Sequence, residues 1–186
     1  MRNEDLPIDE RVTFVRWDDK HIKQLPGVAN NLKISANMAD RFPSPYTHQD
    51  ASNFVKKMML CSETHSWAIE LDGHLVGGIG LSIRTGAAFH STGLAYWLGE
   101  EYWGKGIASY AVKNIVTYVF DTIKLVRIET TVFHWNSASV RVLEKCGFTK
   151  EGTLKSSFIK NGKIVDRYVF SLIEKKNFAL FESDPV

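Results

Sequence analysis

The sequence predicts an α+β fold in which a mixed, mostly antiparallel sheet of seven strands is flanked by helices. Three observations support this class. Short runs of alternating apolar and polar residues recur along the chain, and the tight-turn pairs Asp72-Gly73 and Asn161-Gly162 separate some of them. Apolar residues spaced three and four apart mark helices between others. Strands joined by tight turns pair antiparallel, whereas a helix between two strands permits a parallel crossover.

The first part of the chain is predicted to form a strand and then a helix. Alternation favours a strand over residues 12–17. Asp18 or Asp19 is a suitable N-cap for a helix that reaches about Leu25. The pair at 26–27, proline followed by glycine, is expected to interrupt this helix because proline removes a hydrogen bond from a helix interior.

The middle of the chain reads as one helix followed by three strands. Thr47 resembles an N-cap for a helix over residues 48–60, whose apolar residues gather on one side. Residues 66–71, 74–83 and 91–98 have the alternation of strands and follow one another closely. They are predicted to form an antiparallel meander.

The last part alternates helices and strands. Paired apolar residues one turn apart predict a helix from Ile107. Strands are expected over residues 125–132, 148–158 and 164–173, and a helix lies between the first two of these, over residues 136–146. The tail beyond the last strand is polar and is expected to fray.

Composition excludes several classes of protein. The 186 residues suit one domain, 1–186, with a single sizeable core. A net charge of +2, from 23 basic and 21 acidic residues, is too balanced to indicate a nucleic-acid or anionic-membrane partner. No apolar run approaches the roughly 20 residues that a bilayer requires. The polar, acidic N-terminus is unlike a signal or transit peptide, and we expect a cytoplasmic protein, monomeric or homodimeric.

The two cysteines, Cys61 and Cys146, lack the spacing of a metal site. Free thiols are the default interpretation for a cytoplasmic chain, and we expect no metal.

A glycine-bearing turn between the strand at 91–98 and the helix from Ile107 indicates a phosphate site. Backbone N–H groups at a helix N-terminus are unpaired and lie at the positive end of the helix dipole. Gly104 and Gly106 lack a Cβ, so a ligand can approach the backbone there. The turn is not a Walker loop, because Lys105 is followed by glycine, and a dinucleotide fingerprint would need a glycine where Ser109 stands. The alternative is a plain chain reversal.

A second segment, Asn-Ser-Ala-Ser-Val-Arg-Val-Leu-Glu-Lys-Cys-Gly-Phe at 136–148, narrows the choice. Together with Tyr-Trp-Gly-Lys-Gly-Ile-Ala at 102–108, it closely resembles the GNAT superfamily of acetyl-CoA-dependent N-acetyltransferases, and within it the RimJ/RimL type. Asn136 follows Gly106 by 30 residues (136 − 106), which is the spacing of that family. The resemblance covers about residues 10–173.

The resemblance implies where acetyl-CoA binds. A V-shaped splay between the fourth and fifth strands would admit the cofactor, with pantetheine along the main chain near Trp97 and Leu98 and one backbone N–H meeting the thioester oxygen. The remaining implied contacts come from the loop, the helix start after it and the second motif: Trp103, Gly104, Lys105, Gly106, Ile107, Ala108, Asn136 and Ser139. Glu101 stands where the family often has Gln or Arg, so main-chain groups are expected to hold the diphosphate.

The resemblance also suggests catalytic residues. Many relatives have a tyrosine at the position of Leu143 to protonate the departing thiolate, and in the RimJ/RimL type a serine at the position of Ser139 takes this role. The alternative for Ser139 is a small interior residue bonded to the main chain. Phe42 and Tyr46 fall in the region that borders the acceptor site in that family. The alternative for both is ordinary packing.

A general base is harder to assign. Phe158 and Thr131 stand where relatives carry a glutamate. Glu129 is our candidate, since strand alternation places it on the same face as Thr131. The alternative is an ion pair of Glu129 with Arg127. His134 is a second candidate because histidine titrates near neutral pH, and an amine that arrives deprotonated would need no base.

These observations predict transfer of an acetyl group from acetyl-CoA to a primary amine, such as a protein or peptide N-terminus, by direct attack on the thioester. The alternatives are a small-molecule N-acetyltransferase acting on a polyamine, amino sugar or toxin, and a non-catalytic acyl-CoA-binding module. No nucleic acid or membrane is expected as a partner.

Overall fold

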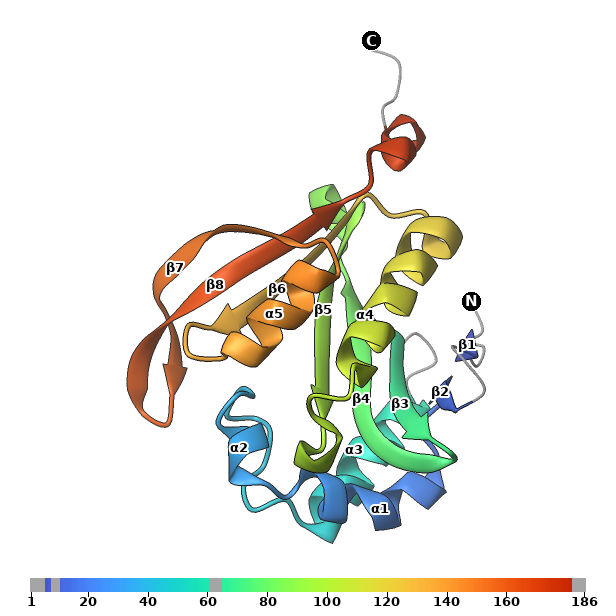
Figure 1. The fold of residues 1–186 in the computed structure, drawn as a ribbon, viewed down its shortest axis with the longest axis vertical. Coiled ribbons are helices and arrows are strands. Elements are labelled where there is room, and N and C mark those ends of the chain that lie inside the picture. Colours follow the sequence, from blue (N-terminus) through green and yellow to red (C-terminus); the bar gives the residue numbers. More distant parts are fainter. Residues whose placement is uncertain (1–5, 8–10, 61–64, 182–186) are drawn as a thin grey trace.

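The computed structural model describes residues 6–7, 11–60 and 65–181, which build one mixed sheet with helices around it (Figure 1). The strand order is β1-β2-β3-β4-β5-β6-β8-β7. The strands are β1 (Leu6–Pro7), β2 (Val12–Val15), β3 (His65–Leu71), β4 (His74–Ile83), β5 (Ser91–Leu98), β6 (Arg127–Phe133), β7 (Thr149–Lys160) and β8 (Lys163–Ile173). Strands β2 to β8 confirm the predicted seven-stranded sheet, and β1 is a two-residue addition at its edge.

The sheet is antiparallel except between β5 and β6. These two strands pair in parallel through three residue pairs only, from Ser91–Arg127 to Gly93–Glu129. Beyond Gly93 none of the described residues pairs with β5 on that side, and Figure 1 shows β6 running away from it. The predicted splay between the fourth and fifth long strands is therefore confirmed.

Two hairpin turns have the geometry that their sequences predict. Asp72 and Gly73 both have positive φ, 51° and 78°, and join β3 to β4. Asn161 and Gly162, with φ of 49° and 74°, join β7 to β8. Two successive positive φ angles match the right-handed twist of the flanking strands, which is why Asp-Gly and Asn-Gly occur here.

The helices lie on both faces of the sheet. They are α1 (Asp19–Ala29), α2 (Leu32–Ser35), α3 (His48–Leu60), α4 (Ile107–Thr117) and α5 (Ser137–Lys145), with a π-helical continuation of α4, η3 (Tyr118–Ile123). Helices α4 and α5 share one core with Trp67 and Ile69, whereas α1 and α3 share the other with Ala68. These three neighbours on β3 alternate between the two cores, as side chains of a strand must.

Helix α1 differs from its prediction, because it continues through Pro26 to Ala29. Proline costs the helix one hydrogen bond, but Leu25 and Ala29 are buried in the core shared with α3, and the Asn30 N–H bonds to the Pro26 carbonyl at 3.2 Å. Tertiary packing outweighs the local preference here. The predicted caps are confirmed: the Asp18 side chain accepts from Lys20 N at 2.9 Å, and Thr47 with Asp50 forms a capping box.

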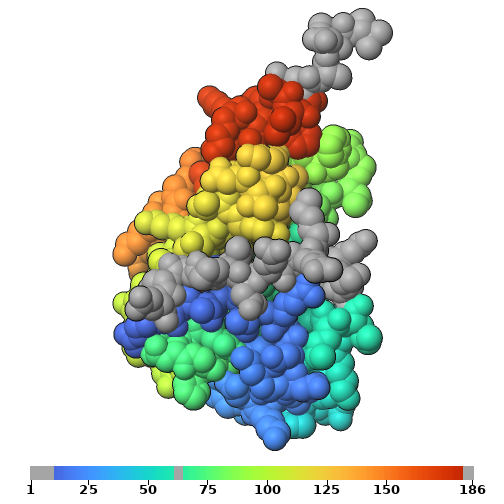
Figure 2. Space-filling model, turned by 90° about the vertical axis from the view of Figure 1, so that its right-hand side faces the viewer, coloured from blue at the N-terminus to red at the C-terminus, as the bar shows by residue number. Residues whose placement is uncertain are grey.

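The described part of the tail, up to residue 181, is more ordered than predicted, while residues 182–186 lie outside the described residues. Residues Lys175–Leu180 form a short 3-10 helix, η4. Its buried Asn177 donates to the carbonyls of Phe120 and Leu125, at 2.9 and 2.8 Å. Figure 2 shows η4 in red against the yellow segment that ends η3. A single amide thus ties the tail to the end of the crossover connection.

Candidate active site

The loop before α4 leaves open space next to its backbone. Gly104 and Gly106 have φ of +74° and +83°, a region that glycine occupies without strain. A Cβ built at either position would have no heavy atom within 4 Å. Gly106 is also the N-cap of α4, so no side chain caps this helix. The end of α4 is therefore accessible to a ligand.

Unpaired backbone donors lie in the same loop. Among the hydrogen bonds of the described chain, none uses the N–H groups of residues 104–108 as donor. The helix itself begins with the Tyr110 N–H on the Gly106 carbonyl, at 3.0 Å, and buried Ile107 anchors it in the core. Free N–H groups at the positive end of a helix dipole suit a phosphate or diphosphate. The residues predicted for the diphosphate of acetyl-CoA thus fit that group.

Trp103 fixes the loop to the end of β5. Its Nε1 donates to the carbonyl oxygen of Leu98 at 2.9 Å. Lys105 is exposed, and its ammonium lies 5.7 Å from the centre of the Tyr102 ring. Glu101 is exposed as well, and makes no attractive contribution to an anion.

The free edge of β5 runs into the splay. Gly99 N–H donates to the Val76 carbonyl on the β4 side at 2.9 Å. Hydrogen-bonding direction alternates along an antiparallel strand, so the main-chain groups of Tyr96 and Leu98 point away from β4. The main chain of Trp97 points toward β4. Of the two residues predicted for pantetheine, Leu98 therefore offers its N–H, while its carbonyl is already bonded to Trp103.

The second motif lies across the splay from this edge. Asn136 caps α5, and its Oδ1 accepts from the Ser139 N–H at 3.1 Å. Ser139 is half-buried, and its Oγ lies 2.8 Å from the phenol oxygen of Tyr96 on β5. The structure thus brings Ser139 and Asn136 together with the free edge of β5.

Tyr96 is a site residue that sequence reasoning missed. It alternates with Leu94 and Leu98 in a strand, so the pattern indicated only a core position. Burial raises the pKa of the Tyr96 phenol to about 12, against a smaller lowering by its hydrogen bond to Ser139. The phenol is therefore neutral and able to donate at physiological pH. Leu143, at the family's tyrosine position, is 0% exposed and belongs to the core.

Glu129 lies in an ion-pair cluster outside the open part of the splay. It is opposite Gly93, where β5 and β6 still pair. Its carboxylate contacts the Arg84 guanidinium and lies 3.4 Å from Arg127 Nε. Arg127 in turn holds Glu151. This surrounding favours the ion-pair interpretation, and a catalytic role for Glu129 stays a prediction.

The other base positions also have structural partners. Thr131 Oγ1 accepts from Arg167 at 3.2 Å, and the Arg167 guanidinium lies 4.8 Å from the Phe158 ring centre. His134 is exposed, with its Nδ1 3.3 Å from the Asp166 carbonyl oxygen. The structure brings none of these side chains to Ser139 by a direct contact among the described residues.

A cavity of about 510 Å³ is lined in part by Phe42, one of the two residues predicted to border the acceptor site. It lies between the segment around α2 and the tip of the β7–β8 hairpin, and its lining residues are Leu32, Ser35, Ala36, Asp40, Phe42, Ser44, Lys160 and Asn161. The Phe42 ring connects it to β5, because its centre is 5.8 Å from that of Trp97 and 5.2 Å from that of Tyr46. Phe42 therefore contacts both the cavity and Trp97 of β5, and its role in binding an acceptor stays a prediction.

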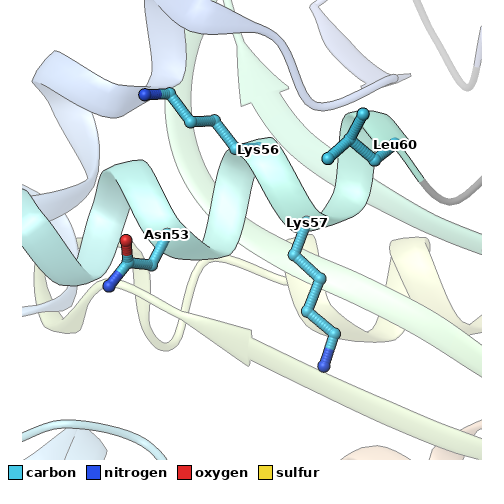
Figure 3. Close-up of a pocket in the computed structure, with 4 residues that line it drawn as sticks. All are labelled: Asn53, Lys56, Lys57 and Leu60. Carbon is cyan, nitrogen blue, oxygen red and sulfur yellow. The ribbon is translucent and has the colours of Figure 1, made fainter.

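A second cavity, of about 480 Å³, lies on the outer side of α3 and contains none of the predicted site residues. Asn53, Lys56, Lys57 and Leu60 line it. Figure 3 shows the two lysine side chains extending in different directions from the helix, so they do not converge on one point.

Three other expectations concern metals, membranes and thiols. The described part of the chain has no group of three or more His, Cys, Asp or Glu side chains that could hold a metal ion. None of its helices is both long and apolar enough to span a bilayer. Cys61 lies outside the described residues, while the Cys146 thiol is free and donates to the Ser109 carbonyl at 3.4 Å.

Comparison with known proteins identifies relatives of this arrangement. The uncharacterized N-acetyltransferase p20 of Bacillus licheniformis is 39% identical over 83 residues, 45% of this chain and 47% of p20. The spermidine N(1)-acetyltransferase of Escherichia coli (strain K12) is 26% identical over 149 residues, 80% of this chain and 76% of that enzyme. The chain spans about half the length of the curated relatives that it matches first.

Solved structures share the fold. A GNAT-family acetyltransferase from Bacillus anthracis has a TM-score of 0.79 at 25% identity, over 88% of this chain and 95% of that one. RimL, the ribosomal L7/L12 alpha-N-protein acetyltransferase in complex with coenzyme A, has a TM-score of 0.82 at 19% identity, over 91% and 98%. The family model described as "Acetyltransferase (GNAT) domain" matches residues 11–149, which is well over half of the sequence. The chain therefore belongs to the GNAT acetyltransferase family.

Proposed function

We propose that this chain transfers an acetyl group from acetyl-CoA to a primary amine. The observation that carries the proposal is the set of unpaired N–H groups at residues 104–108, which follow the part of β5 that is not paired with β6. A diphosphate held there would direct the rest of the cofactor along the free edge of β5. A small free anion would need only the loop in order to bind. Coenzyme A also needs the free edge of β5 and the opening beside it.

Some groups of the chain bind acetyl-CoA, and others polarise its thioester. Acetyl-CoA would supply a thioester that is already activated toward attack by a neutral amine. The loop from Trp103 to Ala108 holds the diphosphate by its main chain, with Lys105 adding charge at the rim. The main chain of Tyr96 and Leu98 orients the pantetheine arm and offers an N–H to the thioester oxygen.

The start of α5 supports the leaving group. Asn136 fixes the backbone of Ser139 at 3.1 Å, and the Ser139 hydroxyl is available to donate a hydrogen bond to the sulfur. Glu129 and His134 remain predicted candidates for the base. An amine that arrives neutral would need neither, since no covalent enzyme intermediate has to form.

We propose the cavity beside Phe42 as the acceptor site and a peptide or protein N-terminus as the acceptor. The relatives leave the class open, because RimL acts on a ribosomal protein and the Escherichia coli relative on spermidine. Charge favours the peptide: Asp40 is the single carboxylate of the lining, and the Lys160 ammonium pairs with it at 2.7 Å. A polyamine would find no uncompensated negative charge there.

A thiol-release assay tests both levels of the proposal. Purified chain and acetyl-CoA are mixed with a peptide that has a free N-terminus, the same peptide with a blocked N-terminus, spermidine or an amino sugar. We expect thiol release with the free peptide and none with the blocked one. Faster turnover of spermidine or the sugar would support the small-molecule alternative. Binding of acetyl-CoA without release for any amine would instead identify an acyl-CoA-binding module.

A further inference from the structure

The contact between Tyr96 and Ser139 bridges the two sides of the splay. Tyr96 belongs to β5, whose ladder with β6 has already ended at Gly93. Ser139 belongs to the first turn of α5, the helix that follows β6 in the chain (Figure 1). Their oxygens are 2.8 Å apart, a good distance for an O–H···O hydrogen bond. A side-chain bond therefore stands where the backbone ladder is missing.

The donors at this contact can be counted. Each hydroxyl carries one proton and can accept as well. The Ser139 N–H is already bonded to Asn136 Oδ1, and the Ser139 carbonyl is 3.5 Å from the phenol, a long contact. The neutral phenol best donates to Ser139 Oγ. The Ser139 proton then remains for a partner outside the protein.

The direction of that proton follows from what surrounds the pair. One side of Ser139 is closed by Asn136 and the helix backbone, and another by Tyr96. Helix α5 presents no second hydroxyl inward at the next turn, since Leu143 is fully buried in the core. Among the described residues, Ser139 Oγ has no hydrogen-bond partner other than Tyr96, so its own proton is available to a ligand.

We propose that Tyr96 is a positioning residue that holds the Ser139 hydroxyl so that its proton faces the thiol sulfur of bound coenzyme A. This inference rests on the proposed function. The phenol and the serine form a two-member hydrogen-bond chain, in which each bond polarises the next. In acetyl transfer the carbon–sulfur bond breaks, its electron pair stays on sulfur, and the proton that the amine loses ends on the thiol. The pair stabilises the negative sulfur without losing a proton for good.

The first test measures binding rather than turnover. Thiolate absorbs in the ultraviolet, so a pH titration of bound coenzyme A gives the pKa of its thiol. We expect Tyr96→Phe and Ser139→Ala to raise this pKa by about half to one unit relative to wild type, which corresponds to one modest hydrogen bond. The double variant should equal Ser139→Ala alone, because the phenol acts through the serine. Tyr118→Phe, a tyrosine packed against Trp67 in the same core, is the control and should match wild type.

The second test divides kinetic effects. Tyr96→Phe is expected to lower kcat about five-fold and to leave acetyl-CoA affinity unchanged, since the group lost touches neither the diphosphate nor the strand edge. An unchanged thiol pKa in Tyr96→Phe, or additive effects in the double variant, would overturn the inference while acetyl transfer stood. If the two variants shift the thiol pKa as expected but no amine is acetylated, only the proposed function would be overturned. Failure to bind coenzyme A would remove both.

Discussion

The carboxylate of Asp40 holds the tip of the β7–β8 hairpin by two bonds, from the Lys160 ammonium at 2.7 Å and the Asn161 N–H at 3.0 Å. Lys160 lies 120 positions after Asp40 in the sequence and is only 8% exposed. These bonds form one wall of the cavity proposed for the acceptor. The hairpin is therefore fixed against the segment that precedes α3.

Asp40→Asn should loosen this wall and leave the Lys160 cation without its counter-charge. We expect the KM for a peptide acceptor to rise several-fold, with acetyl-CoA affinity unchanged by calorimetry. Asp72→Asn is the control, since it breaks the ion pair of Asp72 with Arg11 in a distant turn. Equal acceptor kinetics in both variants would argue against an acceptor at this cavity.

Gly106→Glu should prevent cofactor binding. The substitution places a negative side chain among the free N–H groups and strains a backbone with φ of +83°. Gly73→Glu is matched to it, with φ of +78° and equally open surroundings, but lies in the β3–β4 turn. Both variants should lose about 1–2 kcal/mol of folding stability by denaturant titration.

Only the variant at Gly106 should lose acetyl-CoA affinity in calorimetry. If its affinity equalled that of Gly73→Glu, the diphosphate would have to bind elsewhere.

Glu129→Gln separates a base from an ion-pair partner. Because Arg84 and Arg127 both contact this carboxylate, we expect a loss of less than about 1 kcal/mol in folding stability and nearly full turnover. Glu151→Gln, in the same cluster, should behave alike in the thiol-release assay. A fall in kcat of about 100-fold, together with loss of the acidic limb of the pH–rate profile, would instead establish Glu129 as the base.

Stability should depend on pH through Glu151. Hydrogen bonds from Arg127 and then Ser171 lower the pKa of this carboxyl from 4.5 to about 2. The unfolded chain therefore binds a proton more readily than the folded one, so this contribution is complete above about pH 4.5 and is lost as the pH falls toward 2.

Urea titrations of Glu151→Gln and wild type should differ at pH 6, and the difference should shrink below about pH 4.5 as the pH falls toward 2. Glu144→Gln, at an exposed position of α5, is the control and should show no such convergence. A constant difference between Glu151→Gln and wild type at all pH values would contradict the assignment.

His21 should be a strong determinant of stability. It is 0% exposed, its Nδ1 accepts from Asp18 N at 2.9 Å, and its Nε2 lies 2.9 Å from a carboxylate oxygen of Glu70, which is 3% exposed. His21→Ala removes both bonds and a packed ring, and we expect a loss of about 2–4 kcal/mol in the free energy of unfolding. His48→Ala, at an exposed helix start, should cost less than about 0.5 kcal/mol.

Local signals allowed much of the fold and the cofactor loop to be predicted. The strand at 91–98 and the helix at 48–60 have the predicted bounds, because alternation and a capping residue act over a few neighbours. The turn at Asp72 follows from the same short range. Gly104 and Gly106 indicated a turn with positive φ because glycine adopts this region without strain, and their role in holding the diphosphate stays a prediction.

Contacts between segments that are far apart in the sequence could not be predicted from local patterns. Continuation of α1 through Pro26 depends on packing against α3, and the tail is ordered by the bonds of Asn177 to Phe120 and Leu125. Tyr96 meets Ser139 only because β5 and α5 face each other across the splay. The spacing of apolar residues predicts which face of a strand a residue occupies. It does not predict which side chain of another element lies opposite that residue.

The short parallel ladder between Ser91–Gly93 and Arg127–Glu129 divides the sheet into two parts. The strands β1–β5 form one part and β6–β8 another, and only three residue pairs of the strand ladder join them. Side chains join the two parts as well, because one core holds Leu94 of β5 together with Ile128 of β6 and Phe170 of β8. The width of the opening is therefore set by side-chain packing across it rather than by backbone hydrogen bonds.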